Sequence, residues 1–211
     1  MCVAGSGAGA SPAPQLFRLT VSATSVARFD HTSPSAGGLD CESSQRAVGV
    51  RTAVFRSGRP MLVRFVGRRL QPVVLRDLRG TVMLTGANTS SQICASGGET
   101  QTPEPCSTTT RTFGGARVTF RSAGEGSIAV GTPRVSLRRS GCPREPNEVV
   151  ARPLGQAPGP LHVSHALLDN PRTKRITLTA SASRIKHYGD PEAGILRQRT
   201  AWLLTLVRTG R

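Results

Sequence analysis

Apolar and polar residues alternate along much of the chain, which is the pattern of strands that bury one face of a sheet. The first clear case covers residues 16–28, where Phe17, Leu19 and Val21 alternate with Arg18, Thr20 and Ser22. Further strands are predicted over 47–55, 61–66, 73–75, 81–85, 116–121, 127–137 and 175–184, and an apolar run predicts one more over 199–208. A sustained period of 3.6 residues, which would indicate a long helix, does not appear.

Turn-forming residues separate these segments. Such signals lie at 58–60, 77–80 and 123–126, and the last of them predicts a hairpin loop. Pro133 is expected to split its strand or to place it at a sheet edge, because proline cannot donate to the ladder. A single helical turn is predicted near 164–170, where Ser164 would cap the helix and Pro171 would end it.

Many short strands with few helices predict an all-β protein, and we expect an antiparallel β-sandwich, immunoglobulin-like or jelly-roll-like, of about eight or nine strands. Residues 199–208 are apolar on both faces, so they are expected to form a central strand that is covered on both sides. The stretch 143–160 is rich in proline and glycine. It is expected to be an ordered crossover, because the strands after it would be marginal alone. We therefore expect one domain over 15–211.

Four of the five cysteines, Cys41, Cys94, Cys106 and Cys142, lie in this predicted domain. An even number is typical of disulfide-bonded proteins in oxidising compartments, and two disulfides are expected. Four cysteines allow three pairings. The polar stretch between Cys94 and Cys106 can turn freely, which favours a bridge between them and leaves Cys41 to pair with Cys142.

Residues 1–14 are expected to be the remnant of a signal peptide or a disordered tail. The sequence Ala8-Gly9-Ala10 has the small-x-small form after which signal peptidases cut, and cleavage there would remove Cys2. The apolar segment of about 7–15 residues that a complete signal contains is missing. Three explanations stay open: a start codon placed too far downstream, a chance tail of small residues, and a lipoprotein acylated at Cys2.

The chain carries a formal net charge of +16, which raises the question of an anionic partner. Its basic residues are almost all arginines, a bias typical of GC-rich genomes, and they are spread along the chain. Surfaces that bind single-stranded nucleic acid usually add stacking aromatic residues, but this chain has only six Phe, one Tyr and one Trp. We expect solvated strand faces, with an acidic cell-envelope polymer as the alternative partner, no nucleic acid, and no transmembrane span.

The sequence contains no evident catalytic or metal-binding motif. It lacks a GxSxG elbow and a CxxC pair. His162 and His165 lie near Asp169, but only a helical turn would bring the two rings together. We expect these residues, and also His31 and His187, to be solvated in loops. No metal site and no cofactor are predicted.

A hydrolase acting on envelope polysaccharide is the enzymatic alternative. It would need two facing carboxylates, drawn from Glu99, Glu104, Asp190 and Glu192. Loops are also the usual carriers of recognition. The two candidate loops are 94–106 and 185–198. Asn88-Thr89-Ser90 matches the sequon for N-linked glycosylation.

Several of these segments together resemble exported all-β proteins of unknown function from GC-rich actinobacteria. The resemblance is carried by residues 17–24, Cys41, the loop 94–106 and residues 202–207. It implies an extracytoplasmic location, secreted or in the cell envelope, and no known activity; the incomplete signal departs from the pattern. Our leading hypothesis is a non-enzymatic structural or binding module of the envelope.

Overall fold

The fold was analysed in a computed structural model that describes residues 13–36, 40–133, 146, 150 and 152–209, without the side chains of 112–115. Most of these residues lie in antiparallel strands, and the one helix with defined bounds among them is a single short turn. The elements are β1 (Gln15–Ser35), β2 (Cys41–Ser57), β3 (Met61–Val66), β4 (Arg69–Leu70), β5 (Val73–Cys94), β6 (Glu99–Gly124), β7 (Ser127–Val130), β8 (Leu161–His162), α2 (His165–Asp169), β9 (Arg175–Tyr188) and β10 (Ala193–Arg208). The prediction of an all-β chain is confirmed.

These ten strands form one hydrogen-bonded sheet. Its main order is β9-β10-β1-β2-β5-β6-β7-β8, with antiparallel neighbours throughout. The strand β3 takes the place of β2 beside the first residues of β1, and β4 pairs with β3. The sequence predicted the two separate sheets of a sandwich and about eight or nine strands. That architecture is not confirmed, because all the described strands share a single sheet.

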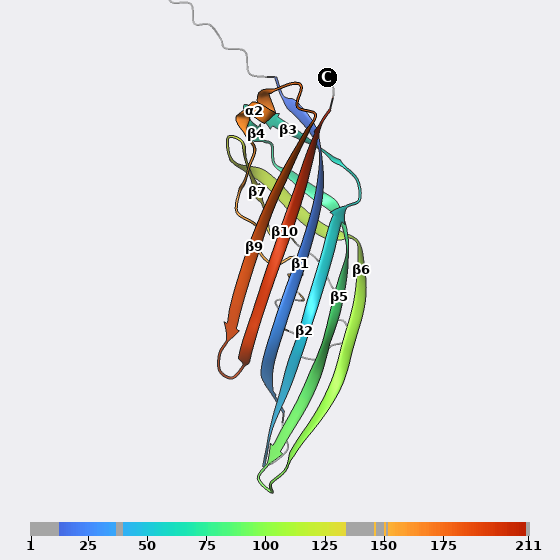
Figure 1. Ribbon diagram of the computed structural model, residues 1–211, viewed down its shortest axis with the longest axis vertical. Helices are drawn as coiled ribbons and strands as arrows, with labels where there is room; N and C mark the ends of the chain where they lie inside the picture. The colour runs from blue at the N-terminus through green and yellow to red at the C-terminus, as the bar shows by residue number, and fades with distance from the viewer. Residues whose placement is uncertain (1–12, 37–39, 134–145, 147–149, 151, 210–211) are drawn as a thin grey trace, which may run out of the picture.

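The sheet is elongated, and its two ends differ (Figure 1). At the upper end of Figure 1, β6 and β7 cross behind β9, β10 and β1, and β8 lies against β9. We call this folded-over part the core end. At the lower end, β2, β5 and β6 continue to the tip and β1 ends shortly before it; we call this part, from about Ser25 of β1 onward, the extended end. The β9–β10 hairpin stops before the tip.

Large apolar side chains on the inner face of the sheet build the core end. The alternation predicted for β1 is confirmed, since its odd-numbered residues point inward from Phe17 to Ser33. The largest side chains buried here include Phe17, Leu19, Phe55, Phe65, Phe120 and Trp202. Each buried side chain of this size stabilises the fold by about 1.5–3 kcal/mol relative to leaving it exposed.

Only one face of β10 is covered, although the sequence predicted cover on both. Trp202, Leu204 and Leu206 are at most 1% exposed on the inner face, whereas Leu203 is 40% exposed and Val207 is 42% exposed on the other. The strand is central in hydrogen bonding, because it lies between β1 and β9. Its apolar outer residues therefore form part of the protein surface.

The predicted turn at 77–80 is a bulge inside one long strand. The register of β5 against β6 shifts between Leu75 and Gly80, and the shift keeps Leu78 fully buried. A Cβ atom at Gly80 would lie 2.5 Å from Cδ1 of Phe55. The glycine thus marks a close approach of backbone to a core ring, as glycines inside strands often do.

The predicted Cys94–Cys106 bridge is wrong, because Cys94 is bonded to Cys41. The residues after Cys94 form only a short turn, and β6 then runs back beside β5. This register places Cys106 opposite Gly86, while Cys41 lies directly opposite Cys94 on β2. Cys106 is 6% exposed. The remaining candidate, Cys142, and also Cys2 lie outside the described residues.

The described part of the stretch rich in proline and glycine lies on the inner face of β1 and β10. Gln198 donates from Nε2 to the carbonyl oxygens of Arg152, at 3.1 Å, and Pro153, at 3.3 Å. Thr200 donates to the carbonyl oxygen of Leu154 at 2.9 Å. The hydroxyl of Ser25 accepts a hydrogen bond from Nε2 of Gln198 at 3.2 Å and can donate to the hydroxyl of Thr200, which lies 3.0 Å away. We call residues 152–154 the strap, because this buried polar group holds them against the sheet.

Two local predictions at the core end are confirmed. The helix α2 begins after Ser164 and ends before Pro171, although the Ser164 side chain makes no capping hydrogen bond, and residues 125 and 126 form the turn between β6 and β7. The part of the predicted strand 127–137 beyond residue 133, and residues 1–12 of the expected tail, lie outside the described residues. No helix in the described ranges is long and apolar enough to cross a membrane.

Candidate functional site

The predicted histidine pair is divided between two contacts at the core end. Nδ1 of His162 lies 2.8 Å from the hydroxyl of Ser127, its cross-strand neighbour on β7. Nδ1 of His165 lies 3.5 Å from Nη1 of Arg68, whose Nη2 is 2.8 Å from the Asp169 carboxylate. Among the described residues, no three His, Cys, Asp or Glu side chains are grouped closely enough to hold a metal ion.

The contact between Ser127 and His162 was not predicted, because it joins two strands that are 35 residues apart. A serine beside a histidine is the beginning of a nucleophilic site, but such a site also needs a third group that orients the ring. In the described part of the chain, no carboxylate contacts His162. Both side chains lie at the surface, so this arrangement is a hydrogen-bonded pair across two short strands.

The ion pair between Arg68 and Asp169 attaches α2 to the turn between β3 and β4. Arg68 has a φ of 64°, which non-glycine residues rarely adopt, and it follows Gly67 in the same region of φ. Beside the pair is a hollow of about 280 Å³, whose polar lining includes Gln15 and Glu125. The contacts of Arg68 are already taken up by Asp169 and His165. This cluster therefore fastens the helix.

The four candidate carboxylates of the hydrolase hypothesis do not form a facing pair. Glu99 and Glu104 are on β6, whereas Asp190 and Glu192 are in the turn between β9 and β10. Measured along the sheet, β6 and β10 are four strand spacings apart, which is about 19 Å. Glu99 accepts hydrogen bonds from Ser91 and Gln101. The sheet thus distributes these groups over separate regions.

Both candidate recognition loops are mostly strand. The chain between Cys94 and Cys106 leaves the sheet only at 95–98, and residues 185–198 leave it only at 189–192. His31 lies on β1 and is 6% exposed, so the prediction of a solvated loop histidine is wrong for this residue. Its ring packs against Tyr188, with 4.4 Å between ring centroids, because both residues face inward.

The sequon at Asn88 lies in a strand. Asn88 is 2% exposed and lies on the inner face of β5, opposite Ala47 of β2. A glycan on this side chain would have no room, because the side chain is buried against the inner face of the sheet. The folded protein therefore does not offer this asparagine for modification.

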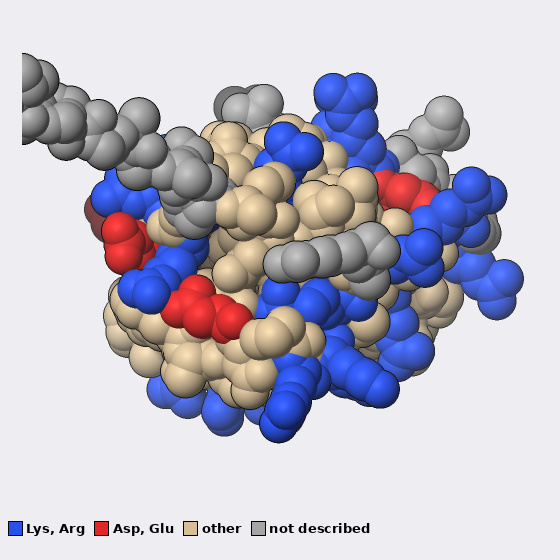
Figure 2. All heavy atoms as spheres, turned by 90° about the horizontal axis from the view of Figure 1, so that it is seen from above, with Lys and Arg blue, Asp and Glu red and all other residues tan. Residues whose placement is uncertain are grey.

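Basic side chains surround the molecule, as Figure 2 shows in a view down onto the core end. One set of them is concentrated on the outer face of the extended end. Arg28 of β1 lies directly opposite Arg197 of β10, and Arg199 follows two residues later on the same face. All three side chains are exposed. We call Arg28, Arg197 and Arg199 the arginine group.

No carboxylate of the described residues neutralises the arginine group. Asp30 is the next residue of β1 on the same face, and its Oδ2 lies 2.6 Å from Nη2 of Arg46. The hydrogen bond from Arg46 holds the pKa of Asp30 below its ordinary value. The strand neighbours Val50 and Ile185, opposite Arg28 and Arg197, are uncharged and exposed. The group is therefore a local excess of positive charge.

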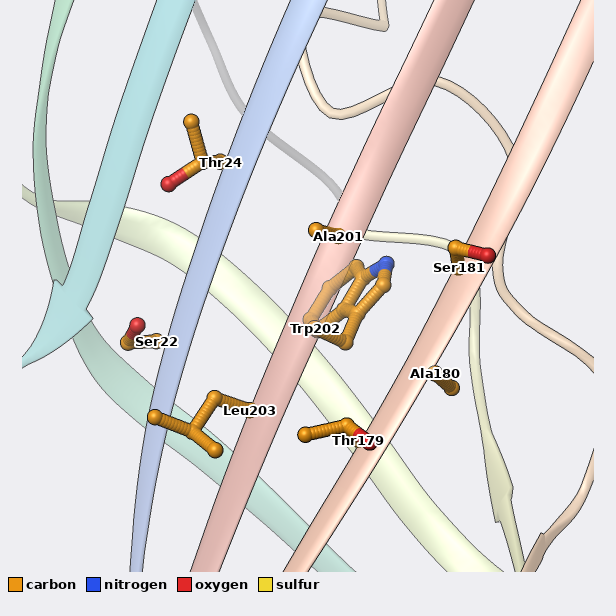
Figure 3. Close-up of a pocket in the computed structure, with 8 residues that line it drawn as sticks. All are labelled: Ser22, Thr24, Thr179, Ala180, Ser181, Ala201, Trp202 and Leu203. Carbon is orange, nitrogen blue, oxygen red and sulfur yellow. The ribbon is translucent and has the colours of Figure 1, made fainter.

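A shallow hollow of about 540 Å³ lies on the same outer face, next to the arginine group. Figure 3 shows its lining from β1, β9 and β10, which includes the hydroxyl-bearing Ser22, Thr24, Thr179 and Ser181 beside Leu203. Arg56 is the cross-strand partner of Ser22, and Arg199 is two residues from Ala201 in the hollow. A hydroxyl-lined surface thus continues into the arginine group.

The arginines were evident in the sequence, but their grouping was not. The signal was present in the alternation, since Arg28 is on the polar face of β1 and Arg197 and Arg199 share one face of β10. What was missing is the register that places the two strands side by side. Comparison with protein-family models, with curated proteins and with solved structures finds no match to this chain.

Proposed function

We propose that the protein is an exported, non-enzymatic binding module of the cell envelope, and that its arginine group binds an acidic polymer. The observation that carries this proposal is the direct opposition of Arg28 and Arg197, with Arg199 beside them. Like charges opposite each other across a ladder destabilise a sheet. A bound polyanion removes this repulsion and gains attraction to all three side chains.

The disulfide supports the proposed location outside the cytoplasm. Disulfides such as Cys41–Cys94 persist mainly in oxidising compartments. We propose that Cys106 and Cys142 form the second disulfide, since they are the two that remain of the four cysteines after position 40. No free thiol is then expected at these four cysteines, so titrating the unfolded, unreduced protein with a thiol reagent should detect at most the thiol of Cys2.

The placement of titratable groups supports binding rather than hydrolysis. The candidate carboxylates on β6 and in the β9–β10 turn are too far apart to flank one glycosidic bond, which requires about 5–9.5 Å. The histidines at the core end belong to separate pairs.

The neighbours of the arginine group favour an acidic polysaccharide or another polyanion over nucleic acid. In the register of the sheet, Arg28 lies opposite Val50 and Arg197 lies opposite Ile185. Arg199 lies between Val26 on one side and Ser183 on the other. None of these side chains is aromatic. These cross-strand neighbours therefore provide no stacking platform for bases of the kind that single-stranded nucleic acid binders use.

Heparin chromatography with matched variants tests the proposal. A triple substitution of the arginine group by glutamine is compared with Arg64→Gln, Arg117→Gln and Arg121→Gln, which remove the same charge from exposed arginines elsewhere. We expect the first variant to elute at clearly lower salt than the second. The slope of the logarithm of its binding constant against the logarithm of the salt concentration should also become shallower. The expected change is about 0.7–0.9 per lost contact if heparin releases counterions as nucleic acids do.

The two variants have the same net charge, so their comparison separates a defined surface from general basicity. Equal shifts would show that the polymer responds only to total charge, which contradicts the proposal. A wild-type protein that passes through the column at low salt would contradict it as well. Circular dichroism of each variant confirms that the fold is retained.

A further inference from the structure

The strand β9 forms an open edge of the sheet. It pairs with β10 from Arg175, which lies opposite Val207, to Tyr188, which lies opposite Gly194. No other described strand hydrogen-bonds to β9. The strand β8 lies near β9 but does not pair with it. Half of the backbone N–H and C=O groups of an edge strand point away from its only neighbour. Between Ile176 and Ser183, no hydrogen bond from another described residue occupies these outward-facing groups, so this segment can accept another strand.

The other long edge of the sheet is protected, and β9 is not. Residues 99–112 of β6 pair with β5 on one side only, and this edge contains Pro103 and Pro105, which have no N–H to donate. The strand β9 has no proline and no register shift. Its segment from Ile176 to Ser183 also carries no charge. This segment has the properties of a strand that accepts a partner.

The charges on β9 indicate which partner fits. Arg175 precedes the uncharged segment, and Arg184 and Lys186 follow it, while β9 contains no acidic residue. A second copy of the chain, paired antiparallel through β9, would bring Arg175 close to Arg184 or Lys186 of the other copy. Like charges opposite each other destabilise such pairing. Carboxylates in the same places would stabilise it.

We propose that β9 binds an extended segment of a partner protein by strand addition, and that this segment has an uncharged centre with a carboxylate near each end. Arg175 and Arg184 are nine residues apart on opposite faces of β9, so the two carboxylates are about 30 Å apart and on opposite faces of the added strand. Main-chain hydrogen bonds hold the segment in place, and the end charges fix its register. Ser183 lies opposite Arg199, so this surface adjoins the arginine group but uses the backbone edge of β9 instead of the side chains of β1 and β10.

A synthetic peptide of about twelve residues is the probe, with alternating Thr and Val in its centre and glutamates nine positions apart. Amide hydrogen exchange of the full-length protein with and without the peptide is the measurement. We expect slower exchange at alternate amides between Ile176 and Ser183. We also expect that replacing the glutamates by lysines, or N-methylating alternate residues of the peptide, weakens binding by more than about tenfold.

Two proline variants show whether the edge itself is used. Ser181→Pro and Ala182→Pro remove neighbouring N–H groups, of which one faces β10 and the other faces the open edge. The variant that unfolds at nearly the wild-type urea concentration identifies the open position, and we expect this variant to lose the peptide. Binding that survives in this variant, binding of the N-methylated peptide at full strength, or no slowing of exchange in β9 would each overturn the proposal.

Discussion

The two ends of the sheet use the same alternating pattern but bury different side chains. At the core end, the inner residues of β1 and β10 are large and apolar, such as Phe17, Trp202 and Leu204. At the extended end, the same faces carry Ser25 and Gln198, and the apolar cluster of buried residues there is small. The comparison shows that alternation predicts strands, whereas the size of the inner side chains determines where a sheet folds over on itself.

The extended end is therefore stabilised by other interactions. The ladders of β2 with β1 and β5 run along its length. The Cys41–Cys94 disulfide joins β2 to β5 near the tip, and Gln198 and Thr200 bind the strap. We expect this end to open locally at a lower free energy than the core end, since it has fewer buried apolar contacts. The arginine group lies on its outer face.

The largest expected effect is at the core end. Trp202→Ala removes a side chain that is 1% exposed and leaves a cavity, so we expect a loss of about 3–5 kcal/mol in the free energy of unfolding, measured with urea. The control is Leu203→Ala, the next residue on the opposite face and 40% exposed, with an expected loss under about 1 kcal/mol. Similar losses for both variants would contradict the one-sided burial of β10.

Removing the disulfide tests the extended end. Replacing Cys41 and Cys94 together by serine releases a link across 53 residues of sequence, and we expect about 2–4 kcal/mol of lost stability. Amide exchange should become faster at the tip of β2 and β5 and remain unchanged around Trp202. Equal acceleration at both ends would mean that the two ends open as one unit, and the comparison would fail.

Gln198→Ala tests how the strap is held. The variant loses hydrogen bonds to two carbonyl oxygens of the strap and leaves these oxygens without this donor. We expect a loss of about 1–2 kcal/mol in the free energy of unfolding, with faster amide exchange confined to the strap and the parts of β1 and β10 that it contacts. Arg199→Ala, on the opposite face of the same strand, is the control and should change stability little. An unchanged stability in Gln198→Ala would show that the strap is held by other contacts.

The smallest effect is expected at the ion pair between Asp30 and Arg46. Both side chains are more than a third exposed, so Asp30→Asn should cost under about 1 kcal/mol. Because the folded protein lowers the pKa of Asp30, this contribution is present above the ordinary carboxyl pKa near 3.8 and disappears as the pH falls through the lowered value. Urea unfolding of both proteins at neutral and acidic pH should show the difference vanish. A difference in unfolding free energy that stays the same at both pH values would contradict the lowered pKa of Asp30.

Most strands were predictable because alternation is a local signal. Residues 61–66 were predicted with the bounds that the structure shows, and the turn of α2 followed from Ser164 and Pro171. The predicted turn at 77–80 was wrong, because a bulge and a turn share the same residue types and only pairing with β6 distinguishes them.

Long-range pairing was the part that the sequence did not determine. The Cys41–Cys94 bridge depends on the register of β2 against β5, and the arginine group depends on the register of β1 against β10. His31 was expected in a solvated loop because β1 was predicted to end at Arg28, whereas the strand continues to Ser35. In each case the residues were known, but their neighbours were not.

Amide hydrogen exchange of the full chain with and without heparin is the most direct test of the proposed binding surface. We expect slower exchange around Arg28 of β1 and around Arg197 and Arg199 of β10, with no change at the core end near Trp202. Protection confined to the core end, or spread evenly over all basic regions, would contradict the assignment of binding to the outer face of the extended end.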